Sequence, residues 1–302
     1  MELGGGIRSF TDFGKNGVQM FFIISGILAA KGFDGKTSNT SDVSKYYIKR
    51  IISIAPLYYF AILWYFVTEN ILEIAWKHIP VDIVGLGWLR YLFLLNGFIA
   101  DDTYFWSNLG ITWTIPVFAF FYLIAPFIMR FMKGYKSALF ALALIFFTER
   151  VALCFYKCTI IENLHFFFIG ILVFFCWKDN VLTPCAFCFT TIAIIFLILG
   201  RNCYPALFAT IICCGLEREI KINEKIQNVV NYIDEHSYTL YLVHGIVFCS
   251  LIDRIRCDRF GIPNAIIGVI AVLGSFCGTV IVHRVIEKPI QGYLKRKLSM
   301  KM

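Results

Sequence analysis

The sequence predicts an all-α polytopic membrane protein with about nine membrane-spanning helices and one half-spanning helix. Apolar side chains make up 59% of the chain and charged side chains only 16%, whereas charged residues are about 25% of a typical soluble domain. The mean hydropathy is +0.71, and the apolar residues gather in runs that suit a hydrocarbon core about 30 Å thick. Because no polar stretch is long enough to form a soluble domain, we expect residues 1–302 to form a single membrane domain.

Nine apolar runs predict the spanning helices, and each has a length suited to one crossing. In chain order they are 12–30, 48–67, 109–129, 137–155, 160–177, 185–200, 203–216, 237–252 and 264–283. A tenth apolar stretch, 84–99, contains Arg90 and includes Asn96-Gly97 near its end. Such a stretch is tolerated in a membrane only where protein surrounds it, so we expect a half-spanning helix there.

The basic residues follow the membrane topology. The net charge is +8, but the 28 Lys and Arg residues lie at the ends of apolar runs and form no single basic face. We therefore expect no nucleic-acid partner. Since basic residues are retained on the cytoplasmic side, their distribution predicts a cytoplasmic C-terminus. Nine spans then place Met1 outside, which favours one further helix upstream of it.

The eleven cysteines predict neither a disulfide framework nor a metal site. Most of them lie inside the apolar runs, where a thiol behaves as a small apolar group. Cys185 and Cys188 have the spacing of half a zinc site, but no second pair or neighbouring His completes it. We therefore expect no bound metal.

Several short blocks carry a resemblance to a known family. They are 17–26 together with 46–59, then Trp113 with 121–123 and Pro126, then 167–170, 237–244 and 287–289. In this order the blocks resemble acyltransferase family 3, the integral-membrane acyltransferases that O-acylate bacterial surface sugars and related acceptors.

The resemblance implies transfer of an acetyl or related acyl group from cytoplasmic acyl-CoA to a hydroxyl of a carbohydrate, often one on a lipid carrier. Acyl-CoA, with acetyl-CoA as the expected form, is then a co-substrate, and no cofactor is bound permanently. The resemblance also implies a protein of the bacterial inner membrane, in contact with membrane lipid, that O-acetylates polysaccharide of the cell envelope. The residues predict no oligomeric state.

An acyl-CoA donor carries phosphates that need cationic partners on the cytoplasmic side. Lys45, Lys49 and Arg50 occupy that side in the predicted topology. These three residues are also explained by topology alone, since basic residues are retained inside. The family pattern has two arginines three residues apart and then a proline; Arg50 and Pro56 match it, and Ser53 does not.

The catalytic residue is not identified by the sequence. The family assigns the general base to a histidine at the end of a helix before the 17–26 block, and this chain has no His before His78. Either the chain is truncated, or the protein is a non-catalytic relative. The family also often carries a glutamate where this chain has Phe118. His244 is a weak candidate for the base.

The residues expected to line an intramembrane substrate site are Ser25, Tyr58, Trp113, Tyr122 and His244. Aromatic residues at a membrane interface, and a hydrogen-bonded structural imidazole, are the plainer interpretations. Glu162 and His165, three residues apart, are expected to form a local pair, and Glu149 is expected to pair with Arg150. The rival functions are a sugar or lipid transporter and a catalytically silent homologue.

Overall fold

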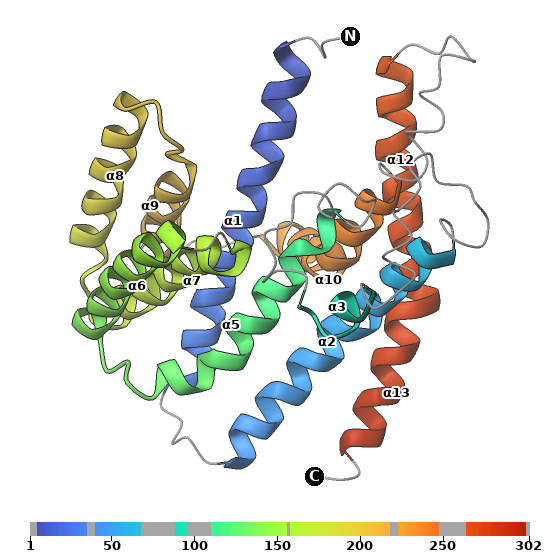
Figure 1. Cartoon of the computed structure of the whole chain (residues 1–302), viewed down its shortest axis with the longest axis horizontal. Helices are drawn as coiled ribbons and strands as arrows, with labels where there is room; N and C mark the ends of the chain where they lie inside the picture. Colours follow the sequence, from blue (N-terminus) through green and yellow to red (C-terminus); the bar gives the residue numbers. More distant parts are fainter. Residues whose placement is uncertain are drawn as a thin grey trace. The chain divides into compact units, whose positions relative to one another are not determined.

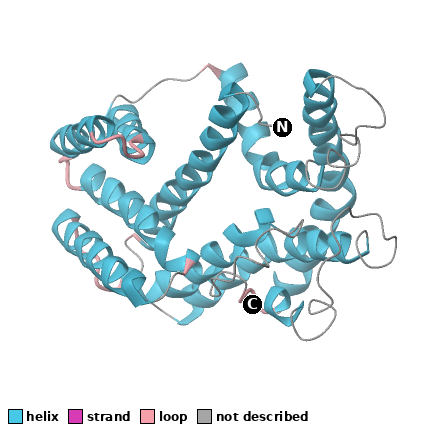
Figure 2. Ribbon diagram, turned by 45° about the horizontal axis from the view of Figure 1, so that its top comes forward, coloured by secondary structure: helices cyan, strands magenta, loops and turns pink. Residues whose placement is uncertain are grey.

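The computed structural model describes residues 5–34, 40–67, 88–95, 110–155, 158–217, 223–247 and 264–299. These residues form helices and a few short turns, and no strand occurs among them (Figure 2). The predicted all-α class is therefore confirmed. Contacts divide the chain into two compact units, one of 1–44, 97–100 and 117–221 and the other of 45–96, 101–116 and 222–302. The single domain stays a prediction.

The first unit is organised around helix α7 (Thr159–Lys178), of which 67% is buried. Helix α1 (Gly5–Phe33) packs along α7, and α6 (Tyr135–Phe155) and α9 (Tyr204–Glu217) also contact it. Helix α8 (Leu182–Ile198) packs against α9 (Figure 1). A helix buried on most of its surface must be apolar all round, which explains why 166–177 is an uninterrupted apolar run.

Two glycines set the distance between α1 and α7. A Cβ atom on Gly26 would lie 2.0 Å from the carbonyl oxygen of Phe167, and one on Gly170 would lie 2.0 Å from that of Ile23. Only glycine lets two helix backbones approach this closely, which is the small-residue contact that holds many membrane helices together. The blocks 17–26 and 167–170 therefore meet at one helix crossing.

The second unit contains helix α2 (Thr40–Phe66), which enters it at Lys45, and helix α10 (Glu224–Ile246). Helix α12 (Asn264–Val282) packs against α10 and continues through a π-helical turn, η5 (His283–Glu287), into α13 (Lys288–Ser299).

Shorter elements complete the second unit. Helix α3 (Trp88–Leu92) lies within the predicted half-spanning stretch, and the 3₁₀ turn η3 (Gly110–Trp113) leads into α5 (Thr114–Met129), which enters the first unit at Val117. The buried side chains of one core cluster come from α2, α3 and α10; they are Leu57, Ala61, Tyr91, Leu242 and Ile246.

Three of the described helices are long and apolar enough to cross a membrane: Asn16–Phe33, Thr159–Lys178 and Ile266–Leu298. The helices α5, α8 and α9 are apolar but shorter, at 16, 17 and 14 residues. The protein is therefore an all-α membrane protein, and the count of nine spans stays a prediction.

Several helix boundaries differ from the predicted ones. Helix α1 begins at Gly5 rather than at 12, and α2 begins at Thr40 rather than at 48. Helix α10 begins at Glu224 rather than at 237, and the last apolar helix continues beyond 283 to Ser299. Hydropathy records where a chain is apolar, but the backbone hydrogen bonds of a helix continue into polar sequence. The parts of 84–99 and 237–252 beyond 88–95 and 247 lie outside the described residues.

Large apolar side chains are exposed in a way that a soluble protein avoids. Ile198 of α8 is 78% exposed, and Leu273 of α12 is 59% exposed. Both stand among further exposed apolar residues of their helices, namely Phe187, Ile194, Leu197, Val269, Ile270 and Phe276. Contiguous apolar surfaces of this kind need a cover, and lipid is the cover that the composition predicts.

Candidate functional site

The predicted donor-binding cations lie near the start of α2. Lys45 and Lys49 are four residues apart, so they share one face of the helix, and both are exposed. Arg50 is half-buried, with its guanidinium carbon 5.4 Å from the centroid of the Tyr46 ring. An arginine held on an aromatic face keeps its planar fork of N–H donors oriented, which suits phosphate recognition.

Ser53 and Pro56 follow Arg50 on α2, and of the two only Ser53 departs from the family pattern. Ser53 stands where the pattern has a second arginine, and its Oγ donates a hydrogen bond of 2.9 Å to the carbonyl oxygen of Lys49. This hydroxyl therefore bonds to its own helix and supplies no positive charge. Pro56 lies inside α2, where the missing N–H breaks one helical hydrogen bond and allows a bend.

Tyr58 lies in the core of the second unit, with 1% of its surface exposed. Its Oη donates a hydrogen bond of 2.7 Å to the carbonyl oxygen of Tyr91, and the Oη of Tyr59 donates one of 2.9 Å to that of Leu92. Both acceptors belong to the end of α3. The two tyrosines therefore hold this short helix through backbone groups that a five-residue helix leaves without internal partners.

A hydrogen bond and a contact between rings link the start of α5 to the side chains of α10. The Oγ1 of Thr114 donates to the Oη of Tyr241 at 2.9 Å, and the ring centroids of Tyr241 and His244 are 5.5 Å apart. The Nδ1 of His244 lies 3.1 Å from the carbonyl oxygen of Leu240. A carbonyl only accepts, so Nδ1 carries the proton of the neutral ring. Trp113, half-buried, directly precedes Thr114.

In the first unit, Ser25 and Tyr122 come together. The Oη of Tyr122 lies 3.4 Å from the Oγ of Ser25, which brings two hydroxyls from α1 and α5 to one point. Tyr122 is 8% exposed, and Ser25 is half-buried. These two predicted lining residues are therefore neighbours.

An aromatic cluster lies beside this hydroxyl pair, and Phe118 belongs to it. The ring of Phe118 is 4.8 Å from that of Phe22 and 6.0 Å from that of Tyr122, while Phe121 and Phe167 stack at 4.0 Å. The position that often holds a family glutamate is thus surrounded by aromatic rings. A carboxylate there would lose hydration without gaining an ion partner among these residues.

A buried acid and histidine pair lies between α6 and α7. The Nδ1 of His165 is 2.8 Å from the Oε2 of Glu149, and the two side chains are 14% and 6% exposed. The predicted pairing of His165 with Glu162, and of Glu149 with Arg150, is therefore wrong in choosing partners on the same helix. A contact between helices depends on their rotation, which sequence spacing does not contain.

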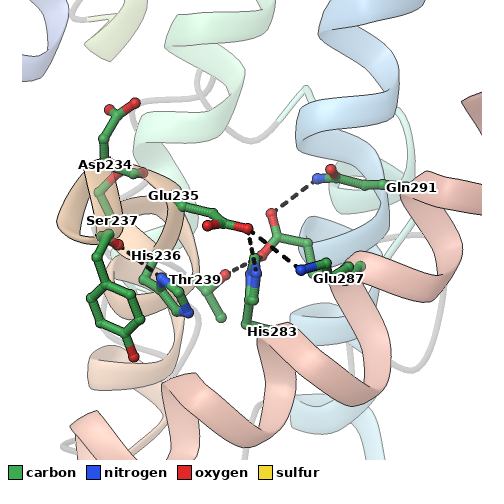
Figure 3. A network of polar contacts seen from close by, with 10 residues as sticks. Asp234, Glu235, His236, Ser237, Thr239, His283, Glu287 and Gln291 are labelled. Atoms are coloured by element: carbon green, nitrogen blue, oxygen red, sulfur yellow. Dashed lines mark hydrogen bonds and ion pairs between the residues drawn. The ribbon is translucent and has the colours of Figure 1, made fainter. Parts of the chain in front are cut away.

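The sequence analysis missed a second polar cluster, where η5 meets α10 (Figure 3). The Nδ1 of His283 is 2.7 Å from Glu287 Oε2, and Glu287 also accepts hydrogen bonds from Thr239 and from Gln291. Placing the end of the last span at 283 separated His283 from Glu287. The signal available was their spacing of four residues, which puts both on one helix face once the helix continues.

The predicted lining residues thus fall in two groups. Ser25 and Tyr122 meet in the first unit, whereas Tyr58, Trp113 and His244 belong to the second, as do Lys45, Lys49 and Arg50. Together these features define an integral membrane protein of apolar helices that carries buried polar and aromatic groups.

The sequence matches the model of an acyltransferase domain, that of acyltransferase family 3, over residues 3–284. The chain therefore belongs to this family and is an acyltransferase-type membrane protein. Comparisons with curated proteins and with solved structures gave no match.

Proposed function

We propose that the protein transfers an acetyl or related acyl group from acyl-CoA to a hydroxyl of a carbohydrate. The match of residues 3–284 to an acyltransferase domain is the observation that carries the proposal. In the reaction the thioester C–S bond breaks and an ester C–O bond forms. The hydroxyl proton leaves through a base, and coenzyme A departs as the thiol.

The start of α2 supports the choice of acyl-CoA as donor. Lys45, Lys49 and Arg50 offer three positive charges within six residues of one helix. The coenzyme carries phosphates at the end remote from its thioester, so cations that hold the phosphates leave the thioester free to extend elsewhere. The proposal puts this end of α2, and the C-terminus, in the cytoplasm of a bacterium, the compartment that supplies acyl-CoA.

Hydroxyl and aromatic groups support a carbohydrate acceptor. The Ser25 and Tyr122 hydroxyls, 3.4 Å apart, are able to exchange hydrogen bonds with sugar hydroxyls. Trp113 offers an aromatic face of the kind on which the apolar face of a sugar ring packs. A lipid-linked acceptor would also fit a protein whose helices are covered by lipid.

His244 is the candidate for the general base in this proposal. With the proton on Nδ1, the neutral imidazole has its basic lone pair on Nε2. A positioned base of this kind contributes about 10²–10⁴-fold to a rate. Replacing His244 by alanine should therefore lower kcat by about that factor and change the KM for acyl-CoA little.

The experiment uses the full chain in bacterial membranes, with radiolabelled acetyl-CoA and a lipid-linked oligosaccharide fraction as acceptor. We expect release of coenzyme A thiol and appearance of label in base-labile esters on carbohydrate. Arg50→Ala should raise the KM for acetyl-CoA about 10–100-fold, since losing a charged hydrogen bond costs about 1.5–3 kcal/mol.

The matched control is Arg130→Ala. Arg130 lies 5.7 Å from the ring centroid of Phe127, so it makes a similar aromatic contact, but it follows α5 and does not belong to α2. Its replacement should leave the KM unchanged. Equal effects of the two variants would remove Arg50 from the donor site. Folded protein that moves no label from acetyl-CoA to any carbohydrate would contradict the proposed function and favour a silent homologue.

A further inference from the structure

Three potential metal ligands lie together where α10 meets the π-helical turn η5. They are Glu235 and His236 of α10 and His283 of η5, and their ligand atoms all lie within 4.8 Å of one another. Figure 3 shows the three side chains converging from two helices. Two imidazoles and one carboxylate form a common protein donor set for zinc and related divalent transition metals.

Both imidazoles are held in the form that binds metal. The Nδ1 of His283 lies 2.7 Å from Glu287 Oε2, and the Nδ1 of His236 lies 2.8 Å from the carbonyl oxygen of Tyr232. A carboxylate and a carbonyl only accept hydrogen bonds, so each Nδ1 donates its proton and Nε2 is the ring nitrogen that remains for a metal ion. A metal-binding histidine with its other ring nitrogen hydrogen-bonded to a carboxylate is the usual supporting arrangement.

The buried Nε2 of His283 indicates that a ligand binds here, because this nitrogen lacks a hydrogen-bond partner among the described residues. The side chain is 8% exposed, and among the described residues no atom completes a hydrogen bond with this Nε2. The Oε1 of Glu235 lies 3.4 Å away, which without a cation between them would bring the lone pairs of a neutral ring and of a carboxylate together.

The separation of these two atoms is that of two ligands on one ion. Zinc bonds to His and carboxylate of about 2.05 Å, at tetrahedral angles, place neighbouring ligand atoms about 3.3 Å apart. The Nε2 to Oε1 distance of 3.4 Å agrees with this value. The ligand atom of His236, the third residue, lies within 4.8 Å of the other two. To reach the separation of about 3.3 Å expected between ligands of one ion, it has to move by at most about 1.5 Å.

The geometry points to a site for a divalent transition metal ion of the zinc class, bound by Glu235, His236 and His283. Glu287 orients His283, and Thr239 and Gln291 in turn donate hydrogen bonds to Glu287. The three protein ligands leave a fourth position for water. This site differs from the expectation of no bound metal, which considered only cysteine pairs.

The ion would be accessible to water and would link two helical elements. The Glu235 side chain is 53% exposed, so the cluster opens to its surroundings on this side. The ion joins α10 to η5 within the second unit and does not depend on acyl transfer. Lys288, whose Nζ is 3.8 Å from Glu235 Oε1, is the cation that competes for this carboxylate.

The experiment titrates Co²⁺ into the purified full chain, freed of metal with a chelator and kept in detergent. Thiols are first blocked with an alkylating reagent, because the described cysteines are free. We expect one Co²⁺ per chain, a visible absorption band of tetrahedral intensity, and its loss on adding Zn²⁺. His283→Ala and His236→Ala should each abolish the band, and Glu287→Gln should weaken binding about 10–100-fold.

His165→Ala is the matched control, because His165, with 14% of its side chain exposed, also lies beside a glutamate but outside this cluster. It should keep full Co²⁺ binding. Glu235→Gln tests the site even if His283→Ala fails to fold, since the Glu235 side chain is 53% exposed; it should remove the tetrahedral band. Absence of stoichiometric binding would overturn the proposal in favour of a protonated His283 between two carboxylates. Unchanged binding by the His236 and Glu235 variants would overturn it as well.

Discussion

The crossing of α1 and α7 makes Gly26 the position where one methyl group should matter most. In Gly26→Ala the new Cβ would stand 2.0 Å from the Phe167 carbonyl oxygen, while ordinary contact begins at 3.4 Å. The two backbones would have to separate by about 1.4 Å, the difference between these distances. The obstacle is backbone rather than a mobile side chain, so the strain has no local release.

The expected cost is about 3 kcal/mol, the upper end for overpacking a core. The separation would also loosen Phe22 and Phe167, whose ring centroids are 4.8 Å apart. The assay is thermal unfolding of the purified protein in detergent, followed by intrinsic tryptophan fluorescence and by thiol labelling of the buried cysteines. We expect the midpoint of Gly26→Ala to fall by on the order of 5 °C.

Gly32→Ala is the matched control in the same helix. No atom lies within 4 Å of a Cβ built on Gly32, and alanine is a better helix former than glycine by about 1 kcal/mol. This variant should unfold at the same temperature or slightly higher. If the two variants unfold alike, the close approach of α1 and α7 is refuted, together with the structural reason for glycine in these two sequence blocks.

Three further predictions concern buried polar groups and the donor cations. Tyr58→Phe leaves a buried carbonyl of α3 without its donor and should destabilise the protein by about 1–3 kcal/mol in chemical unfolding. Tyr59→Phe, at an exposed ring, should cost less, and equal effects would contradict the stabilising role of the buried Tyr58 hydrogen bond. Glu149→Gln should cost about 3 kcal/mol in the same assay if His165 is its ion partner, because a buried pair is broken on one side, and no loss would show that the pair is neutral. Lys49→Ala should raise the KM for acetyl-CoA. The difference in KM between variant and wild type should shrink in high salt, because an exposed charge is screened. An effect on kcat alone would exclude a donor-binding role for Lys49.

The fold class followed from composition because lipid contact demands apolar surface along whole helices. The exposed residues of α8 and α12 are the direct expression of this demand. Helix ends were predicted less well. Helix α10 starts at Glu224, in polar sequence, since capping by Asn223 and continued backbone bonding define its start rather than hydropathy.

Contacts in the candidate site were predictable only where the residues are close together in the sequence. The grouping of Lys45, Lys49 and Arg50 on one helix was predictable, because neighbours in sequence stay neighbours in a helix. The hydrogen bond from Tyr58 to Tyr91 was not, because it joins two helices through residues 33 positions apart in the sequence. His165 found its acid on another helix for the same reason.

The π-helical turn η5 has a consequence for everything that follows it in the chain. A π turn holds one residue more than the α-helical turn it replaces, and each helical residue advances by about 100°. The extra residue is therefore absorbed within the turn, and the basic segment Lys295–Lys297 keeps about the direction that a regular helix with one residue fewer would give it. Removing a single residue from 283–287 would therefore leave a regular α-helical turn with that segment in about the same direction, whereas a deletion elsewhere in α12 or α13 would rotate everything after it by about 100°.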